Sequence, residues 1–235
     1  MGGDPFDAAR NVVLGAVLET NIGGVRTAGL ITEAEVYIGG SDKASHTYGY
    51  RRTERVMSQY EMGGHAYVFL VYGIHAQFCV VLGERDVPNV VLVRSVMPLW
   101  GTDEMLRRRG KIKPDDGIPS RRIKAKLDAA LCAGPGNATK ALGVTTRLNG
   151  VDLCASDEIG LYVPAEPETG AGRDISSHAV MPCSDEALRA ILSARADEIV
   201  EAPRVGIDYA EEYAAMKWRY YYRNNRFVSK KLRAQ

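Results

Sequence analysis

The chain has 235 residues, of which 46% are hydrophobic and 25% are charged, and its formal net charge is +1. This composition is typical of a globular protein, and no apolar run approaches the roughly 18 residues that span a membrane. The cysteines lie far apart without a CxxC pair, which argues against a zinc knuckle or a disulfide framework; they are Cys79, Cys132, Cys154 and Cys183. The N-terminus lacks a secretory signal. We therefore expect a cytoplasmic protein, or a nuclear one in a eukaryote, that needs no membrane, metal or cofactor.

The first hundred residues predict one short helix followed by strands. The helix is expected over Asp7–Val13. Strands are predicted over Ala16–Thr20, Val25–Tyr37, Ala66–Leu82 and Asn89–Val96, with a tight turn at Asn21–Gly24. Residues Ile38–Met62 are rich in glycine and charge, and an irregular segment of this length is usually functional.

Helices dominate the rest of the chain. Helical spacing predicts them over Thr102–Arg109, Ile123–Cys132, Asn137–Leu142 and Asp185–Ile199. Strands that come early and have short connections favour an α+β fold over a doubly wound one. We predict a single domain over residues 1–235, with a mixed, mostly antiparallel sheet, surrounding helices and a protruding β-hairpin.

The segment from Thr32 to Gly73 carries the strongest chemical signal. Glu33, Glu35 and Tyr37 alternate along a predicted strand and would share one face. His46 follows, and more aromatic residues lie on the next apolar run. A carboxylate, an imidazole and aromatic rings suit a pocket that binds a flat, polar-edged ring and performs water chemistry. The same spacing also fits a sheet edge with a satisfied histidine and ordinary core aromatics.

Charge is unevenly distributed along the chain. Residues 107–126 hold nine basic and two acidic residues, and residues 217–235 hold seven basic and no acidic residues. Acids gather instead at residues 185–212, where eight of them face three arginines. Such polarity allows a basic surface for phosphates in a neutral chain, although solvated surface charges would give the same pattern.

Six strings in one order resemble the 3-methyladenine (alkyladenine) DNA glycosylase family. They are TEAEVY, GGHAYVFLVYGIH, VVLVRSVMP, LCAGPGNATKALGV, PRVGIDYA and WRYYYRNN. The resemblance extends from about Val12 to Ser229. It implies a monofunctional base-excision enzyme that flips a damaged purine out of double-stranded DNA and hydrolyses its N-glycosidic bond. It further implies simple hydrolysis without a cofactor, and we expect the protein to act as a monomer.

The resemblance also implies three catalytic residues. Glu35 matches the glutamate that activates the attacking water, a role that a single carboxylate can fill. Arg94 matches the arginine that holds this water and the DNA backbone, although it would look the same as a structural partner of Glu35. Val205 matches a residue whose backbone carbonyl touches the water. Glu33 is expected to be structural or solvent-facing.

A base pocket and a DNA wedge follow from the same match. Tyr37 and Phe69 would stack on the flipped base, and His46 would contact its edge. Tyr72 matches a side chain that inserts into the duplex and fills the gap left by the flipped nucleotide. Cys79 stands where the family commonly has an asparagine that crowds the 2-amino group of guanine, so selectivity against guanine is in question.

Other departures mark a divergent member. Phe69 replaces a tyrosine, Val56 replaces an asparagine, Met97 replaces a glutamate, and Asn137 replaces a lysine. We expect activity on 3-methyladenine, and on hypoxanthine or ethenoadenine if the pocket supplies a proton donor. A rival hypothesis of another class is a lesion-binding or nucleic-acid-binding module that keeps this fold without turnover.

Overall fold

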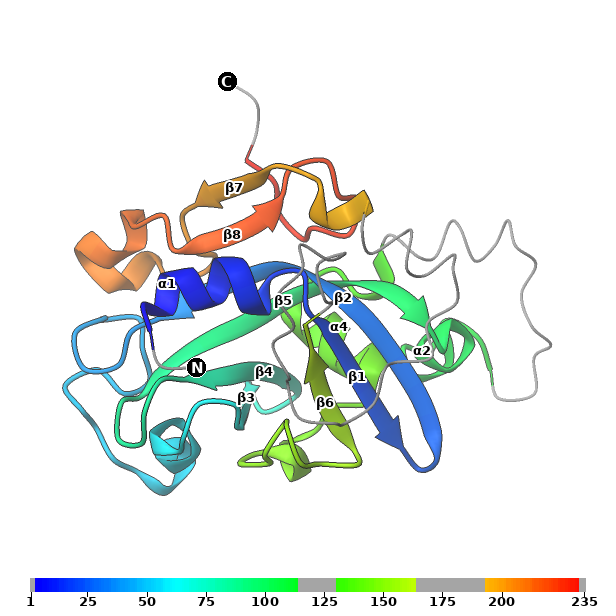
Figure 1. The fold of residues 1–235 in the computed structure, drawn as a ribbon, viewed down its shortest axis with the longest axis horizontal. Coiled ribbons are helices and arrows are strands. Elements are labelled where there is room, and N and C mark those ends of the chain that lie inside the picture. The colour runs from blue at the N-terminus through cyan, green and yellow to red at the C-terminus, as the bar shows by residue number, and fades with distance from the viewer. Residues whose placement is uncertain (1–2, 114–129, 164–192, 233–235) are drawn as a thin grey trace, which may run out of the picture.

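The computed structural model describes residues 3–113, 130–163 and 193–232. In this part of the chain, one eight-stranded sheet organises the fold, and its strand pairings are antiparallel (Figure 1). The strands are β1 (Val17–Ile22), β2 (Val25–Tyr37), β3 (Ala66–Val71), β4 (His75–Leu82), β5 (Asn89–Trp100), β6 (Ile159–Tyr162), β7 (Ile199–Ala202) and β8 (Arg219–Tyr222). Six follow the order β3-β4-β5-β2-β1-β6, and β8 pairs with both β2 and β7.

Strand β2 is the centre of this sheet. Strand β5 runs along one of its edges, while the other edge pairs first with β1 and then, at Glu33–Glu35, with β8. The β2–β5 register shifts on both sides of Glu33, as happens at a β-bulge. The C-terminal half of β2 is therefore enclosed between two strands, and its acidic side chains are taken out of solvent.

Short helices pack around the sheet. They are α1 (Pro5–Ala8), η1 (Ala9–Val13), η2 (Glu54–Tyr60), α2 (Thr102–Arg108), α4 (Pro135–Leu142), η3 (Thr146–Leu148) and η4 (Asp208–Ala215). Helix α4 packs against β4 and β5, and α2 packs against α4. Pro135 starts α4 and Gly143 ends it with φ +74°, because proline suits a first helical position and glycine accepts a left-handed one.

The predicted fold class is confirmed: the protein has an α+β fold with a mostly antiparallel sheet. One predicted element is wrong in its extent. Ala66–Leu82 is two strands, β3 and β4, because the chain reverses at Tyr72–Ile74. Gly73 adopts φ +71° at this turn, which is unstrained only for glycine. That residues 1–235 form one domain stays a prediction.

The predictions are least accurate after residue 113. The predicted helix Ile123–Cys132 lies outside the described residues except at its last three positions. The predicted helix Asp185–Ile199 lies outside them up to residue 192, and Ile199 belongs to β7. Strands β6, β7 and β8 have four residues each, which is too short for a period-based prediction. None of the helices in the described ranges is long and apolar enough to cross a membrane.

Candidate active site

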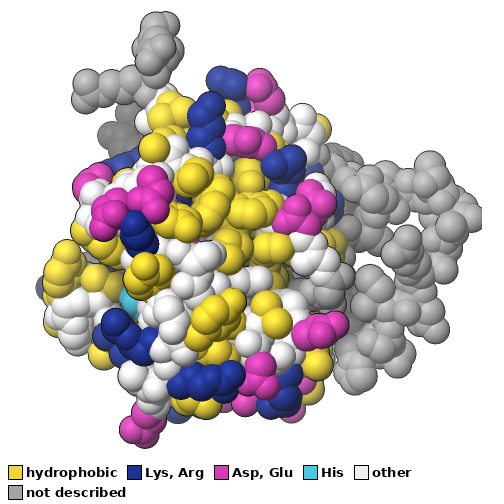
Figure 2. Space-filling view, turned by 90° about the vertical axis from the view of Figure 1, so that its left-hand side faces the viewer, with side chains coloured by type: hydrophobic (Ala, Val, Ile, Leu, Met, Phe, Trp, Pro, Cys, Tyr) yellow, Lys and Arg dark blue, Asp and Glu magenta, His cyan; other side chains and the backbone are white. Residues whose placement is uncertain are grey.

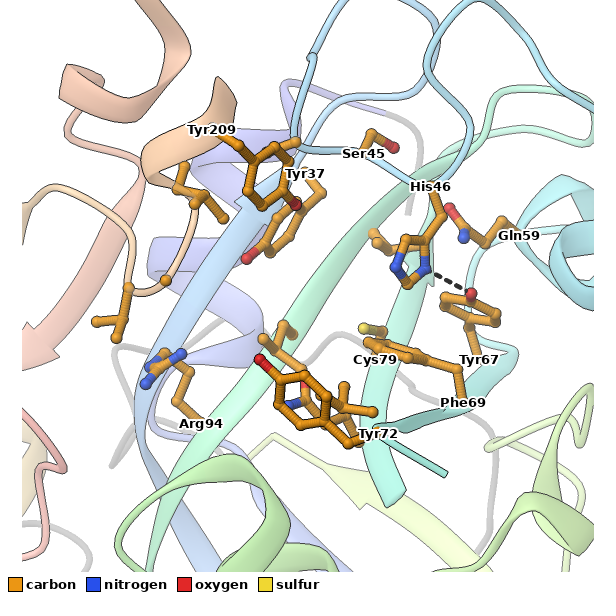
Figure 3. Close-up of a pocket in the computed structure, with 18 residues that line it drawn as sticks. Tyr37, Ser45, His46, Gln59, Tyr67, Phe69, Tyr72, Cys79, Arg94 and Tyr209 are labelled. Atoms are coloured by element: carbon orange, nitrogen blue, oxygen red, sulfur yellow. Dashed lines mark hydrogen bonds between the residues drawn. The ribbon is translucent and has the colours of Figure 1, made fainter. Parts of the chain in front are cut away.

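A cavity of about 290 Å³ lies beside the C-terminal half of β2 (Figure 3). Protein ligand sites begin at roughly 300 Å³, so the space suits one small ring system. Its walls come from β2, the loop at residues 44–46, η2, the β3–β4 hairpin, β5 and residues 205–209. Seven of the eight predicted site residues line it: Tyr37, His46, Phe69, Tyr72, Cys79, Arg94 and Val205.

Glu35, the eighth predicted residue, lies directly behind this wall. Its side chain is fully buried. Oε1 accepts a hydrogen bond from the backbone N–H of Val205 at 2.8 Å, and Oε2 accepts from the Tyr37 hydroxyl at 2.9 Å and from Arg94 Nη1 at 3.3 Å. All three partners line the cavity. The carboxylate is thus oriented by donors that stand between it and the pocket.

Glu33 was expected to be either structural or solvent-facing. The structure supports the structural role, and the solvent-facing alternative is wrong. Its side chain is fully buried. Oε1 accepts from Arg94 Nε at 3.1 Å and Arg219 Nη1 at 2.8 Å, and Oε2 accepts from the Ser229 N–H at 2.7 Å and Ser95 Oγ at 3.0 Å. Burial opposes ionisation of Glu33, but Arg94 and the hydrogen bonds from Ser229 and Arg219 outweigh it, so the pKa of Glu33 lies below its ordinary value.

Arg94 bridges the two glutamates from β5. Its Nε meets Glu33 and its Nη1 meets Glu35, and its side chain is only 8% exposed. The structural pairing with Glu35 is therefore present. Arg94 also lines the cavity, so the position allows the catalytic role as well. Because Glu33 holds the Nε edge, the terminal nitrogens of the guanidinium are left to face Glu35 and Ser229.

Two aromatic rings reach the cavity from different strands. Tyr37 comes from β2 and Phe69 from β3 (Figure 3). Burial, and then the charge of Glu35, raises the pKa of Tyr37 well above its ordinary value, so its hydroxyl stays protonated and donates to Glu35. Phe69 stacks on Tyr67 with ring centroids 5.1 Å apart. One face of Phe69 is therefore already covered.

His46 meets the same cavity from the loop that follows β2. Its Nδ1 is 2.8 Å from the Tyr67 hydroxyl, and its ring packs at a right angle to Phe69, 4.6 Å away (Figure 3). Burial, and then the positive charge of Arg55, lowers the pKa of His46 to about 4. The imidazole is therefore neutral at physiological pH and offers one donor and one acceptor.

Cys79 lines the cavity from β4 and is 2% exposed. Burial, and then the charge of Glu35, raises the pKa of its thiol well above the ordinary value. A protonated thiol at this position behaves as a small hydrophobic side chain. The wall it forms is smoother and less polar than an asparagine would make.

Tyr72 stands at the turn between β3 and β4. It is 91% exposed and adopts φ +52°, a left-handed conformation that is uncommon for a tyrosine. Ile74, at the same turn, is 74% exposed. The turn thus presents an aromatic and an aliphatic side chain to solvent at the edge of the cavity, as a wedge would require.

Tyr67 lines the cavity, as expected of the aromatic run it shares with Phe69, although no role was assigned to it. Four further residues of the site were not predicted. Gln59 and Tyr209 line the cavity, and Arg204 with Asp42 forms a buried ion pair close behind it. These four lie in loops or short helical turns, where sequence spacing predicts no side-chain direction.

Two basic residues near the C-terminus are paired with acids, which lowers the free positive charge there. Residues 114–126 lie outside the described ranges. Near the C-terminus, Arg219 is buried on Glu33, and Arg223 pairs with Glu198 at 2.7 Å. Figure 2 shows acidic, basic and hydrophobic side chains interspersed on the face that it draws. A uniformly basic surface is therefore not present on that face.

Comparison with known proteins agrees with this geometry. Residues 2–226 match the family described as methylpurine-DNA glycosylase. A protein of Bacillus cytotoxicus named "Putative 3-methyladenine DNA glycosylase" is 37% identical over 229 residues, covering 97% of this chain and 96% of the relative. Proteins with the same name from Clostridium perfringens (strain SM101) and Chlamydia abortus are 37% and 34% identical, covering 93% and 88% of this chain and 91% and 87% of the relatives.

The family match and the relatives' names place the chain in the class of DNA glycosylases. The chain belongs to the methylpurine-DNA glycosylase family. Its substrate is accordingly DNA.

Proposed function

We propose that this protein is a monofunctional glycosylase that extrudes an alkylated purine from duplex DNA, holds it in the cavity and hydrolyses its N-glycosidic bond. The observation that carries the proposal is Glu35, a fully buried carboxylate oriented by three groups that line an aromatic cavity. A buried, oriented carboxylate beside a ring-sized cavity is an arrangement suited to activating water next to a bound base.

Water reaches Glu35 only if one of its three partners gives way. The contact from Arg94 is the longest, at 3.3 Å, and Arg94 keeps its bonds to Glu33 and Ser229 when that contact is lost. We therefore place the water between Arg94 and Glu35 Oε2. The bonds from Val205 and Tyr37 would keep the carboxylate aimed during the exchange.

The reaction is a hydrolysis at C1′ of the sugar. Glu35 accepts a proton from the water, the water oxygen bonds to C1′, and the bond from C1′ to the purine nitrogen breaks. The negative carboxylate also stabilises the positive charge that develops on the sugar. A purine alkylated at N3 or N7 carries a positive charge, so it takes the bonding electrons and leaves neutral. The described residues that line the cavity include no lysine, so no Schiff base is required.

The base would stack between Tyr37 and the hairpin side of the cavity formed by Phe69. Positively charged purines such as 3-methyladenine are the preferred substrates, because the neutral imidazole of His46 is a poor proton donor for an uncharged base. Hypoxanthine and ethenoadenine would be removed more slowly. Cys79, which lacks the bulk of an asparagine, would admit the 2-amino group of alkylated guanine.

Tyr72 would fill the space that the extruded nucleotide leaves. Inserting a side chain between base pairs costs a few kcal/mol of unstacking, and a damaged base that pairs poorly lowers that cost. An exposed ring on a hairpin turn at the cavity edge is suitably placed for this step.

The test uses a duplex with one alkylated purine. The duplex is incubated with the protein and then heated in alkali, which cleaves the strand at abasic sites. We expect Glu35→Gln to lower the single-turnover rate at least about 100-fold, within the range for loss of a general base. Glu84→Gln, on the exposed loop between β4 and β5, is the matched control and should excise like wild type. Tight binding by wild type without any cleavage would instead establish the rival hypothesis of a binding module.

The same preparation tests the oligomeric state. We propose that the protein acts as a monomer, because Glu35, the cavity and the Tyr72 turn are all supplied by one chain. Light scattering of the active fraction should give a mass near 25.7 kDa.

A further inference from the structure

Arg204 and Asp42 form an ion pair behind the cavity wall, and both side chains are fully buried. Nη2 of Arg204 donates to Asp42 Oδ1 at 2.9 Å, while Nη1 donates to Asp42 Oδ2 and to the carbonyl oxygen of Val36. The guanidinium also lies over the rings of Tyr37 and Trp218, at 4.5 and 4.9 Å from their centroids. Neither charged residue lines the cavity, so the pair can act on the site only through its neighbours.

One half of the pair joins the Val205 segment to β2. Arg204 directly precedes Val205, so its position fixes where the Val205 N–H meets Glu35 Oε1, at 2.8 Å. Its bond to the Val36 carbonyl, at 2.9 Å, falls between Glu35 and Tyr37 on the strand. The guanidinium therefore sets the spacing between the carboxylate, the stacking ring and the N–H that orients the carboxylate.

The other half holds the loop that carries His46. Asp42 Oδ1 accepts from the N–H of Ala44 at 2.9 Å, and the Asp42 carbonyl accepts from the N–H of Ser45 at 2.9 Å. These bonds shape the turn immediately before His46, which lines the cavity. Three parts of the cavity wall, two of them near the end of β2 and one at Val205, thus meet at one ion pair.

Stability alone is a weak explanation for this arrangement. Taking two charges out of water offsets much of their mutual attraction, so buried ion pairs are often replaceable by apolar residues. Arg204 Nε is moreover buried without a hydrogen-bond partner. What the pair supplies instead is geometry, because a planar guanidinium fork fixes direction as well as distance.

We propose that Arg204 is a positioning residue for base excision and that, through Asp42, it holds Val205, Tyr37 and the His46 loop in register. This inference rests on the proposed function. It assigns Arg204 no contact with the base or the water.

Arg204→Lys is the first test, because lysine keeps the charge but lacks the planar fork. We expect its single-turnover excision rate to fall about ten- to hundred-fold, as for a small misplacement of catalytic groups. Its affinity for a duplex with a tetrahydrofuran abasic-site analogue should stay within about two-fold of wild type, since such binding depends on phosphate contacts. The double variant Asp42→Leu/Arg204→Met replaces the pair as a unit, which folded proteins tolerate better than loss of one partner. It should show the same loss of rate.

Leu106→Ala on α2 is the control for a purely structural effect, because Leu106 is fully buried and does not line the cavity. All variants are assayed at a temperature where each is folded by circular dichroism. The Leu106→Ala control should excise within about two-fold of wild type. If the Arg204 variants do so as well, small displacements of the cavity groups do not affect excision and the proposal is overturned. A wild-type protein that releases no base overturns the proposed function instead, and wild type alone reveals that failure.

Discussion

Glu33→Gln would measure how strongly the fold depends on its buried charges. The substitution removes a carboxylate that accepts from Arg94 and Arg219, both buried, and from Ser95 and Ser229. Removing one partner of a buried ion pair costs about 3–5 kcal/mol. A change of 1 kcal/mol shifts the unfolding midpoint of a chain of 150–250 residues by about 2–4 °C, so we expect a drop of roughly 6–20 °C.

The loss of stability in Glu33→Gln should depend on pH in a defined direction. The pKa of Glu33 is lower in the folded protein than its ordinary value of 4.5. Its ionised form therefore stabilises the fold above that value, and the contribution is lost as the pH falls through the lower, folded pKa. The difference in midpoint between wild type and variant should be full at neutral pH and should shrink below about 4.5. Scanning calorimetry across this range gives both quantities.

Glu198→Gln is the matched control, because Glu198 pairs with Arg223 at the surface. Exposed ion pairs contribute little, so its midpoint should barely move. A Glu33→Gln variant that melts with wild type at neutral pH, or a difference that widens in acid, would refute the reasoning. We also expect the variant to excise more slowly, since Arg94 loses the partner that holds its Nε edge.

Three further predictions follow from single residues of the cavity. Tyr72→Gly should leave the unfolding midpoint unchanged or raise it, because glycine accepts the left-handed turn, while excision falls about ten-fold or more through loss of the wedge; a lower midpoint with full activity would contradict this. Cys79→Asn should lower release of 7-methylguanine relative to 3-methyladenine in a panel of modified duplexes. An unchanged ratio would contradict the proposal that Cys79 admits the 2-amino group of guanine. His46 should titrate by NMR near pH 4, and because its proton binds more tightly in the unfolded chain, stability should decline as the pH drops from about 6.5 towards 4; a titration near 6.5 would show that the ring is not desolvated.

Local spacing singled out the acidic residues of β2, His46 and the aromatic run, and the family resemblance supplied their roles. Glu35, Tyr37 and His46 lie within twelve residues of each other, and Phe69 and Cys79 lie on the two paired strands of one hairpin and both line the cavity. The resemblance alone supplied Arg94, Val205 and Cys79 as site residues, and the structure brings Arg94 and Val205 to Glu35. Whether these residues have the assigned roles stays a prediction.

Pairs of charged residues that are far apart in the sequence could not be predicted. Glu33 was expected to be less important than Glu35, which lies two residues along the same strand face. Its hydrogen-bond partners, however, lie up to 196 positions away in the sequence. Arg204 and Asp42 meet across 162 positions. Strand β8 was missed because Arg219-Tyr-Tyr-Tyr is buried at all four positions and shows no alternation. Period-based reasoning detects a half-buried strand, and β8 is buried on both faces.

The contact between Val205 and Glu35 also has a consequence for biosynthesis. It joins residues 170 positions apart, and the neighbouring β2–β8 pairing is of similar span. The ribosome therefore releases the strand that carries the carboxylate long before the segment that orients it. Pairings of such high sequence separation form slowly. A chain cut short before Val205 would contain the aromatic rings and the β3–β4 turn, but it would lack the N–H that donates to Glu35 Oε1. If Glu35 has the proposed role, we expect such incomplete products of translation to excise no base.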